Sequence, residues 1–253
     1  MAQIKISIIN ASTVVGDQEA QAAVGPLQKQ VSQHFAPAWG VDADLDFVGT
    51  GKQPPMDHWW LVVLDYSDMS GALGYHDMTP AGLPLGKIFA GTDKQYGSSW
   101  TVTASHELLE MLGDPDINLT AMSMTDFQVD QNVVGRLYAY EVCDACEADK
   151  FGYKINGTVV SDFVYPSWFE SFRKKGAQFD YGKRITAPFQ LLSGGYIGVF
   201  DVTAGSGWQQ VTAQSALMYS ARPRVGSRRE RRRTPREEWL VSDVRKRTTA
   251  RAA

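Results

Sequence analysis

The chain has 253 residues, which is enough to bury a sizeable core, and 43% hydrophobic against 21% charged residues is the composition of a globular protein. No stretch reaches the roughly 18 apolar residues that a membrane-spanning helix needs, and the N-terminus does not resemble a secretory signal peptide. We therefore expect a cytoplasmic protein without a membrane partner. Two cysteines, Cys143 and Cys146, are too few for a disulfide framework.

The net charge of -3 conceals a strong asymmetry along the chain. Residues 222–253 contain 12 Lys/Arg and 4 Asp/Glu, a balance of +8, which leaves 13 Lys/Arg and 24 Asp/Glu, a balance of -11, in residues 1–221. We interpret residues 1–221 as one folded domain and residues 222–253 as a basic tail whose composition predicts disorder. No aromatic or groove-reading pattern accompanies the arginines of the tail, so nucleic acid is not an expected partner.

Apolar periodicity predicts a mixture of strands and helices in the first part of the domain, residues 1–113. In chain order, the sequence predicts a strand at 4–8, a helix at 17–35, strands at 41–47, 59–66 and 87–90, and a helix at 99–112. Gly25-Pro26 predicts a kink in the first helix, because proline removes a helical hydrogen bond. The Gly- and Pro-containing stretch 71–86 carries no predicted element.

The second part of the domain, residues 114–221, is predicted to be rich in β structure after a loop at 114–135. Asn156-Gly157 separates two short runs of strand-forming residues, which is a strong signal for a two-residue hairpin. Further β and aromatic segments are expected at 136–142, 163–169 and 189–202. Together the two parts predict an α+β fold.

The predicted helix at 99–112 carries the clearest chemical signal in the chain. One face is apolar and consists of Ala104, Leu108, Met111 and Leu112. The opposite face is polar and consists of Thr103, His106, Glu107, Glu110 and Asp114. The simplest interpretation is a surface helix whose solvated polar face happens to contain the pattern H-E-x-x-E.

A second interpretation is a metal site. His106 and Glu110 are four residues apart, so both side chains can reach one point above the helix and share a divalent ion. Glu107 lies beside them and can act as a general base toward a metal-activated water. This is the logic of the H-E-x-x-H metallopeptidases, which the sequence resembles with Glu110 in place of the second histidine. Zinc is the first expectation, and because a carboxylate is a harder ligand than an imidazole, calcium and manganese are further candidates.

The order His-Glu-x-x-Glu, Asp-Pro and Glu-x-x-Asp-x-Cys resembles a family of bacterial proteins regarded as peptidases, and it is similar to the exordium-type secreted plant proteins. The matching residues are His106, Glu107, Glu110, Asp114-Pro115, Glu141, Asp144 and Cys146. The resemblance covers about residues 105–170. A more distant resemblance is to the metzincins, whose turning glycine and third ligand correspond to Gly113 and Asp116.

These resemblances imply a zincin-like domain, in which a twisted mixed sheet lies over the metal-binding helix and a β-rich part follows. They disagree about the third metal ligand. The metzincin comparison implies Asp116, whereas the other implies Glu141 or Asp144, and we expect Glu141 because an acid at 116 is not part of the wider pattern. The strand at 87–90 precedes the helix as the substrate-pairing edge strand does in zincins, and it could bind an extended peptide by strand addition.

The implied activity is hydrolysis of a peptide or protein substrate. Glu107 would be the general base, and the metal ligands would be His106, Glu110 and Glu141. The alternative is a catalytically inactive zincin-like binding or structural protein, part of a larger assembly, whose site holds a structural ion or none.

The remaining histidines and the cysteines carry weaker signals. His76, in Gly-Tyr-His-Asp-Met, is expected to be a loop histidine rather than a wall of the site. His34 and His58 are expected to be structural. Cys143 and Cys146 are expected either to form a small disulfide or to stay as buried thiols.

Overall fold

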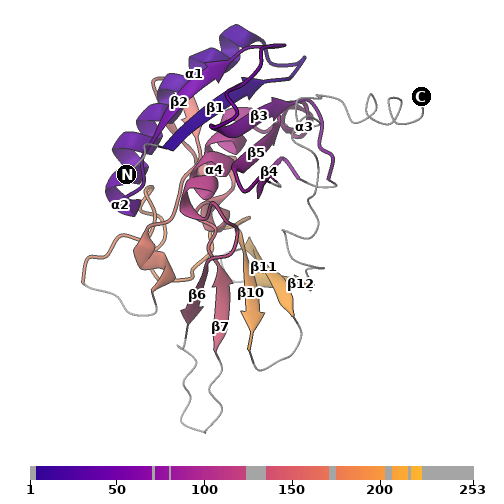
Figure 1. The fold of residues 1–253 in the computed structure, drawn as a ribbon. Helices are drawn as coiled ribbons and strands as arrows, with labels where there is room; N and C mark the ends of the chain where they lie inside the picture. Colours follow the sequence, from indigo (N-terminus) through magenta and orange to yellow (C-terminus); the bar gives the residue numbers. More distant parts are fainter. Residues whose placement is uncertain are drawn as a thin grey trace, which may run out of the picture.

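The computed structural model describes residues 4–69, 72–79, 81–123, 135–170, 175–202, 207–215 and 218–223. Within these residues the chain forms two five-stranded sheets, a two-stranded hairpin, and helices that lie mainly against the first sheet (Figure 1). The fold is therefore α+β, as the sequence predicts. None of the described helices is long and apolar enough to cross a membrane.

The first sheet is mixed and has the strand order β2-β1-β3-β5-β4. Its strands are β1 (Ile4–Asn10), β2 (Ala43–Val48), β3 (Trp59–Leu64), β4 (Gly74–Met78) and β5 (Pro84–Phe89). Four of them run parallel, and β4 pairs antiparallel with β5 at the edge. The expectation that residues 87–90 form an edge strand is wrong, because β5 lies inside the sheet. The edge position belongs to β4, in a stretch where the sequence predicts no element.

Side chains of the central strands alternate between two hydrophobic clusters on opposite faces of this sheet. Ile6 and Ile8 of β1 pack into the larger cluster, whereas Ile9 packs into the smaller one. In β3, Leu61 joins the larger cluster and Val62 the smaller. A strand that is buried on both faces needs apolar residues at consecutive positions, which explains the continuous apolar run in β3.

The helices are α1 (Asp17–Lys29), α2 (Ala36–Trp39), α3 (Ala90–Tyr96) and α4 (Trp100–Gly113). Helices α1 and α4 lie on the same face of the first sheet, where both contribute to the larger cluster (Figure 1). A π-helical segment at Gln30–Phe35 joins α1 to α2, so the predicted helix at 17–35 is confirmed in extent. Pro26 lies within α1, and the geometry changes from α to π four residues after it.

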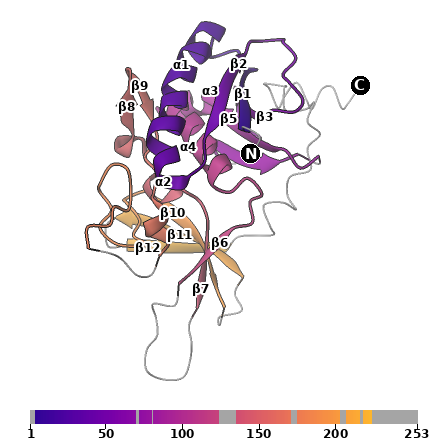
Figure 2. The same ribbon diagram turned by 60° about the vertical axis from the view of Figure 1, so that its left-hand side comes forward.

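The second sheet is antiparallel and has the strand order β12-β11-β10-β7-β6. Its strands are β6 (Thr120–Ser123), β7 (Arg136–Ala139), β10 (Tyr196–Asp201), β11 (Trp208–Ser215) and β12 (Met218–Pro223). Figure 1 and Figure 2 both show this sheet below α4 and the first sheet above it. Helix α4 is therefore the central element of the fold.

Some predicted elements of the second part differ from those observed. The Asn156-Gly157 turn joins β8 (Tyr153–Ile155) to β9 (Thr158–Val160) as predicted, with positive φ angles at both turn residues. The segment 163–169 is not a strand, because it ends in a 3-10 turn at Pro166–Phe169. Proline has no N–H to donate to a strand ladder but suits the first position of such a turn.

Two further boundaries also differ. The predicted loop at 114–135 contains β6, and the predicted β segment at 189–202 forms a strand only from Tyr196 onward. Of the predicted tail, Arg222 and Pro223 belong to β12. Residues 224–253 lie outside the described residues.

Candidate metal centre

Helix α4 is buried along almost its whole length, which the sequence does not indicate. Every residue from Val102 to Leu112 is buried, including His106, Glu107 and Glu110, whose exposed fractions are 6, 5 and 2%. The interpretation as a surface helix with a solvated polar face is therefore wrong. Three ionisable side chains on a buried helix cost free energy unless they are paired or bind a metal ion.

Polar contacts from other segments fix both ends of α4. Before the helix starts, the Ser99 backbone N–H donates a hydrogen bond to Asp149 Oδ2 at 2.8 Å. After its last turn, the Asp114 carboxylate accepts hydrogen bonds from the backbone N–H groups of Asn118 and Leu119, at 3.1 and 3.0 Å. Asp114, the acid of the Asp-Pro pair, thus closes the turn that follows the helix.

A glycine lets the edge strand β4 approach α4 closely. A Cβ atom on Gly74 would lie 2.7 Å from Thr103 Cγ2 and 2.9 Å from Glu107 Oε1. Such contacts are too short for carbon, so β4 can keep this distance only with glycine at position 74. The close packing brings the side chain of His76, two residues further along β4, to the helix.

His106, Glu110 and Asp144 form the first of two groups of ligand-type side chains, here called the His106 triad. His106 Nε2 lies 3.3 Å from Glu110 Oε1 and 3.3 Å from Asp144 Oδ1. One ligand atom from each residue lies within 4.8 Å of the other two, and all three residues are buried. A single divalent ion could bind all three side chains.

His76, Glu107 and Glu110 form the second group, here called the His76 triad. His76 Nδ1 lies 3.4 Å from Glu107 Oε2 and 3.4 Å from Glu110 Oε2. The three ligand atoms again lie within 4.8 Å of one another. Glu110 therefore belongs to both triads.

Asp144 reaches the His106 triad because the segment after β7 packs tightly against the end of α4. A Cβ atom on Gly113 would lie 2.8 Å from Val142 Cγ1, so glycine at the helix end permits the close approach. The Cys143 backbone N–H donates a hydrogen bond to Glu110 Oε1 at 3.4 Å. Asp144 then opens a 3-10 turn and is fully buried.

The other candidates for the third ligand lie elsewhere. Glu141 Oε2 lies 3.9 Å from His76 Nε2, so this carboxylate faces the second nitrogen of that imidazole. Asp116 is exposed and belongs to neither triad among the described residues. The distances therefore favour Asp144 as the third ligand beside His106, and ligation by Glu141 stays a prediction.

The carboxylates outnumber the histidines in this region. Burial disfavours the charged form of His106, but the charge of Glu110 and the hydrogen bond to Asp144 outweigh it and raise the pKa of His106 well above its ordinary value. Burial also disfavours the charged form of Glu110, yet His106 and His76 hold the pKa of Glu110 well below its usual range. Burial raises the pKa of Glu147 to about 8. The attraction of His106 opposes this rise, and repulsion from Asp144 adds to it. A divalent cation would balance this surplus of negative charge.

The chemistry of the donors fits a metal ion. Each triad offers one imidazole nitrogen and carboxylate oxygens, which are ligands of zinc and manganese sites. Glu107 Oε2 is buried and forms no hydrogen bond within the part of the chain that the structure describes. A buried oxygen in this state costs free energy, which a bound cation would offset. The buried His, Glu and Asp groups could therefore hold a metal ion.

The two cysteines are buried free thiols and do not form a disulfide. Burial, followed by repulsion from nearby carboxylates, raises the pKa of Cys143 and of Cys146 well above the ordinary value. A thiol that stays protonated is a poor nucleophile and a poor metal ligand. Both cysteines therefore act as packing residues beside the His106 triad.

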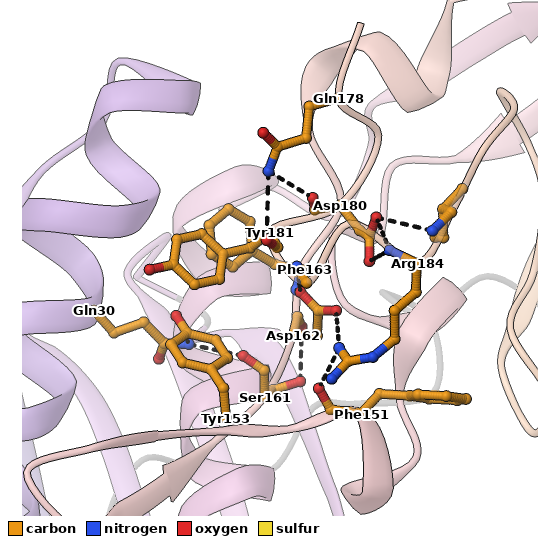
Figure 3. A network of polar contacts seen from close by, with 12 residues as sticks. Gln30, Phe151, Tyr153, Ser161, Asp162, Phe163, Gln178, Asp180, Tyr181 and Arg184 are labelled. Carbon is orange, nitrogen blue, oxygen red and sulfur yellow. Dashed lines mark hydrogen bonds and ion pairs between the residues drawn. The ribbon is translucent and has the colours of Figure 1, made fainter. Parts of the chain in front are cut away.

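A polar network holds the segment after β9 against α4 and α1. The Ser161 backbone N–H donates a hydrogen bond to Ser105 Oγ of α4 at 2.5 Å, and Gln30 Nε2 donates one to the Ser161 carbonyl at 2.8 Å. Figure 3 shows how the next residue, Asp162, accepts a hydrogen bond from Arg184 Nη1, 3.0 Å away. The network therefore fixes α4 one residue before the first member of the His106 triad.

His76 is a strand residue beside α4 and not the loop histidine that the sequence predicts. The sequence carries little signal for this strand, because Gly-Tyr-His-Asp-Met shows no clear apolar alternation. His34 and His58 belong to neither triad and have polar partners, which is consistent with the structural role expected of them. His34 Nδ1 lies 3.0 Å from Tyr153 Oη, and His58 Nδ1 lies 2.9 Å from Ser7 Oγ.

Searches against protein-family models, curated proteins and solved structures found no match for this chain. The resemblance to the peptidase and exordium-type families therefore rests on the motif residues alone, and membership of either family stays an expectation. The geometry of the two triads does not depend on that resemblance.

Proposed function

We propose that the chain is a metal-dependent peptide hydrolase with a zincin-like domain. The observation that carries this proposal is the His106 triad, whose buried donor atoms lie within 4.8 Å of one another and whose Glu110 is also grouped with Glu107. We assign the metal to His106, Glu110 and Asp144, and the role of general base to Glu107. Zinc is the first candidate and manganese the second, because both accept imidazole together with carboxylate. Calcium prefers ligand sets made of oxygen alone and fits less well.

Glu107 carries the proton in this mechanism. The cation would supply Lewis acidity, which polarises the scissile carbonyl and lowers the pKa of a water molecule. Glu107 takes the proton from that water and delivers it to the leaving amine. Its Oε2 makes no hydrogen bond within the described part of the chain, so accepting the proton breaks no existing hydrogen bond there.

The edge strand β4 supports an extended peptide as the substrate. It pairs with β5 on one side, and no described strand pairs with its other side. A peptide added to that edge would lie beside the strand that carries His76. Backbone hydrogen bonds to an edge strand are a common way to hold an extended peptide. An edge strand next to the metal helix is also the arrangement expected of a zincin-like domain.

The burial of the site favours a second candidate function, a zincin-like binding or structural protein with a structural ion. The exposed fractions of His106, Glu110 and Asp144 are 6, 2 and 0%. A hydrolase must admit a peptide carbonyl to its metal, whereas a structural ion has a closed set of ligands. The two candidates differ in whether Glu107 does chemistry.

The substitution Glu107→Gln distinguishes the hydrolase from the protein with a structural ion, because the amide keeps the shape of the side chain and removes the base. Wild type and variant, each loaded with one equivalent of zinc, are incubated with a mixed peptide library, and the products are followed by mass spectrometry. We expect the variant to keep one zinc ion per chain and to lose about 10²- to 10⁴-fold in turnover. Glu170→Gln, at an exposed position, is the matched control and should cleave like the wild type. If the zinc-loaded wild type cleaves nothing that the variant leaves intact, the ion is structural.

A further inference from the structure

Glu110 presents a different carboxylate oxygen to each histidine. Its Oε1 lies 3.3 Å from His106 Nε2, whereas its Oε2 lies 3.4 Å from His76 Nδ1. One carboxylate thus serves two separate groups of ligand-type atoms. This is the arrangement of a carboxylate that bridges two cations, as found in two-metal hydrolytic sites.

Glu107 provides an independent observation at the same place. Its side chain is buried, and its Oε2 forms no hydrogen bond within the described residues. This oxygen lies 3.4 Å from His76 Nδ1, the same atom that Glu110 Oε2 faces at 3.4 Å. A buried carboxylate oxygen without a hydrogen bond is costly, and a cation between Glu107, Glu110 and His76 would compensate for it.

The negative charge of four buried carboxylates around the two triads also supports a second cation. Glu107, Glu110, Glu141 and Asp144 have exposed fractions of 5, 2, 1 and 0%. One divalent cation would balance two of these four buried carboxylates, and a second would balance the other two. Buried charges need such compensation because the protein interior solvates them poorly.

We propose that His76, Glu107 and Glu110 form a second cation position, so that the protein holds two divalent ions bridged by Glu110. One nitrogen and two carboxylates suit zinc or manganese. Glu141 Oε2 lies 3.9 Å from His76 Nε2, the ring nitrogen that the proposed ion would not use, where a carboxylate could support a metal-binding imidazole. The second position rests on the proposed function only for the first ion, at the His106 triad, whereas its effect on cleavage rests on the hydrolase as well.

The second ion has a consequence for regulation of the hydrolase. A cation at Glu107 Oε2 would occupy the oxygen to which the proposed mechanism assigns the proton, and it would lower the basicity of the carboxylate. The form with one ion therefore has a free base, and the form with two ions has a weakened one. Binding of the second ion inhibits cleavage, so the His76 triad acts as a sensor of excess metal.

The experiment measures zinc stoichiometry on the full chain. Protein is stripped with a chelator, titrated with zinc alone, and examined by native mass spectrometry and calorimetry. We expect two zinc ions per chain in the wild type, and one in both His76→Ala and Asp144→Ala. His58→Ala, which removes a histidine outside both triads, is the matched control and should bind two. Circular dichroism reports folding, and His76→Gln replaces His76→Ala if the smaller side chain prevents folding.

The possible results distinguish this inference from the proposed function. A wild type that saturates at one zinc ion, or a His76 variant that still binds two, overturns the second position even if peptides are cleaved. Two ions in the wild type without cleavage support the second position and contradict the hydrolase. Where cleavage is observed, the second equivalent of zinc should lower the wild-type rate about tenfold or more, because Glu107 contributes roughly 10²- to 10⁴-fold as a base.

Discussion

His76 Nδ1 lies 3.4 Å from Glu110 Oε2, although one residue comes from the edge strand β4 and the other from helix α4. Asp144, in the turn after β7, joins them through its contact with His106. The site is therefore assembled from three separate segments of the chain. An ion bound there would tie these segments together, so metal binding and folding stability should be coupled.

The substitution His106→Ala should weaken that coupling. A ligand that binds only the folded protein stabilises it by about 2.7 kcal/mol at 100 times its dissociation constant. We expect zinc to raise the free energy of unfolding of the wild type by about this amount for each ion bound, and to raise that of His106→Ala by less, because only the His76 triad remains there. The measurement is denaturant unfolding with and without zinc. A chelator should return the wild type to its metal-free value, and equal stabilisation of both proteins would contradict the assignment of His106 as a ligand.

The substitution Gly74→Ala should loosen the contact between β4 and α4. The added Cβ atom would lie 2.7 Å from Thr103 Cγ2 and 2.9 Å from Glu107 Oε1, so the strand must move away. Overpacking of this kind costs about 1–3 kcal/mol. Gly25→Ala in α1 is the control, because the added atom meets nothing within 4 Å apart from its chain neighbours, and it should change the free energy of unfolding less than Gly74→Ala does. Thermal unfolding of both variants tests the contrast, and a neutral Gly74→Ala would contradict it.

The part of the site on one helix could be predicted from the sequence, because its geometry is local. His106 and Glu110 are one helical turn apart, so their proximity follows from helix geometry alone, and the structure gives 3.3 Å between Nε2 and Oε1. The burial of the helix could not be predicted in the same way. The spacing of polar residues in the sequence is that of a solvent-exposed helix face, whereas in the structure β4 and the segment of Asp144 cover these side chains.

The contribution of β4 depends on contacts between distant segments, which leave little trace in the sequence. The strand has five residues, Gly74–Met78, and too few apolar positions to show an alternating pattern. His76 is therefore indistinguishable from a loop histidine until the sheet order is known. The later carboxylates are a similar case. The motif indicates both Glu141 and Asp144 as candidates. Only tertiary packing places Asp144 next to His106 and Glu141 next to His76.

The substitution Arg184→Ala should destabilise the network in Figure 3 in a pH-dependent way. Arg184 Nη1 donates a hydrogen bond to Asp162 Oδ2, and Asp162 is fully buried. Burial and repulsion from Asp180 raise the pKa of Asp162 to about 7. Below that pH Asp162 can hold a proton and needs Arg184 less, whereas above it a buried negative charge would lose its partner.

We expect a loss of about 1–3 kcal/mol at pH 8 and a smaller loss at pH 5, after discounting for the partial exposure of Arg184. Denaturant unfolding at both pH values is the measurement. Lys154→Ala, on the exposed side of β8, should change stability little at either pH. A loss that is larger at pH 5 than at pH 8 would contradict this account of Asp162.

Asp93 should cause the free energy of unfolding to decrease as the pH rises. It is fully buried in α3, its Oδ1 accepts a hydrogen bond from Thr103 Oγ1 at 2.7 Å, and its Oδ2 has no hydrogen bond within the described residues. Burial, and after it repulsion from Asp149 and Glu107, raises the pKa of Asp93 to about 7 against the effect of Thr103. The folded protein therefore keeps a proton that the unfolded chain releases near pH 3.8.

Between these two pH values the folded state binds more protons than the unfolded state, so stability declines from about pH 4 to about pH 7 and then levels off. A shift of about three pKa units corresponds to at most about 4 kcal/mol. Asp93→Asn cannot ionise, so its stability relative to the chelator-treated wild type should increase across this window.

Asp65→Asn is a control of opposite sign. Burial opposes the charge of Asp65, but hydrogen bonds from Ser12 and Thr13 outweigh it and lower the pKa of Asp65, so its contribution to stability is present at neutral pH and lost in acid. Unfolding free energies of the three proteins from about pH 2 to about pH 8 test both signs, because the Asp65 contribution changes only below about pH 4. A difference between wild type and Asp93→Asn that does not change with pH would show that Asp93 is already ionised in the folded state.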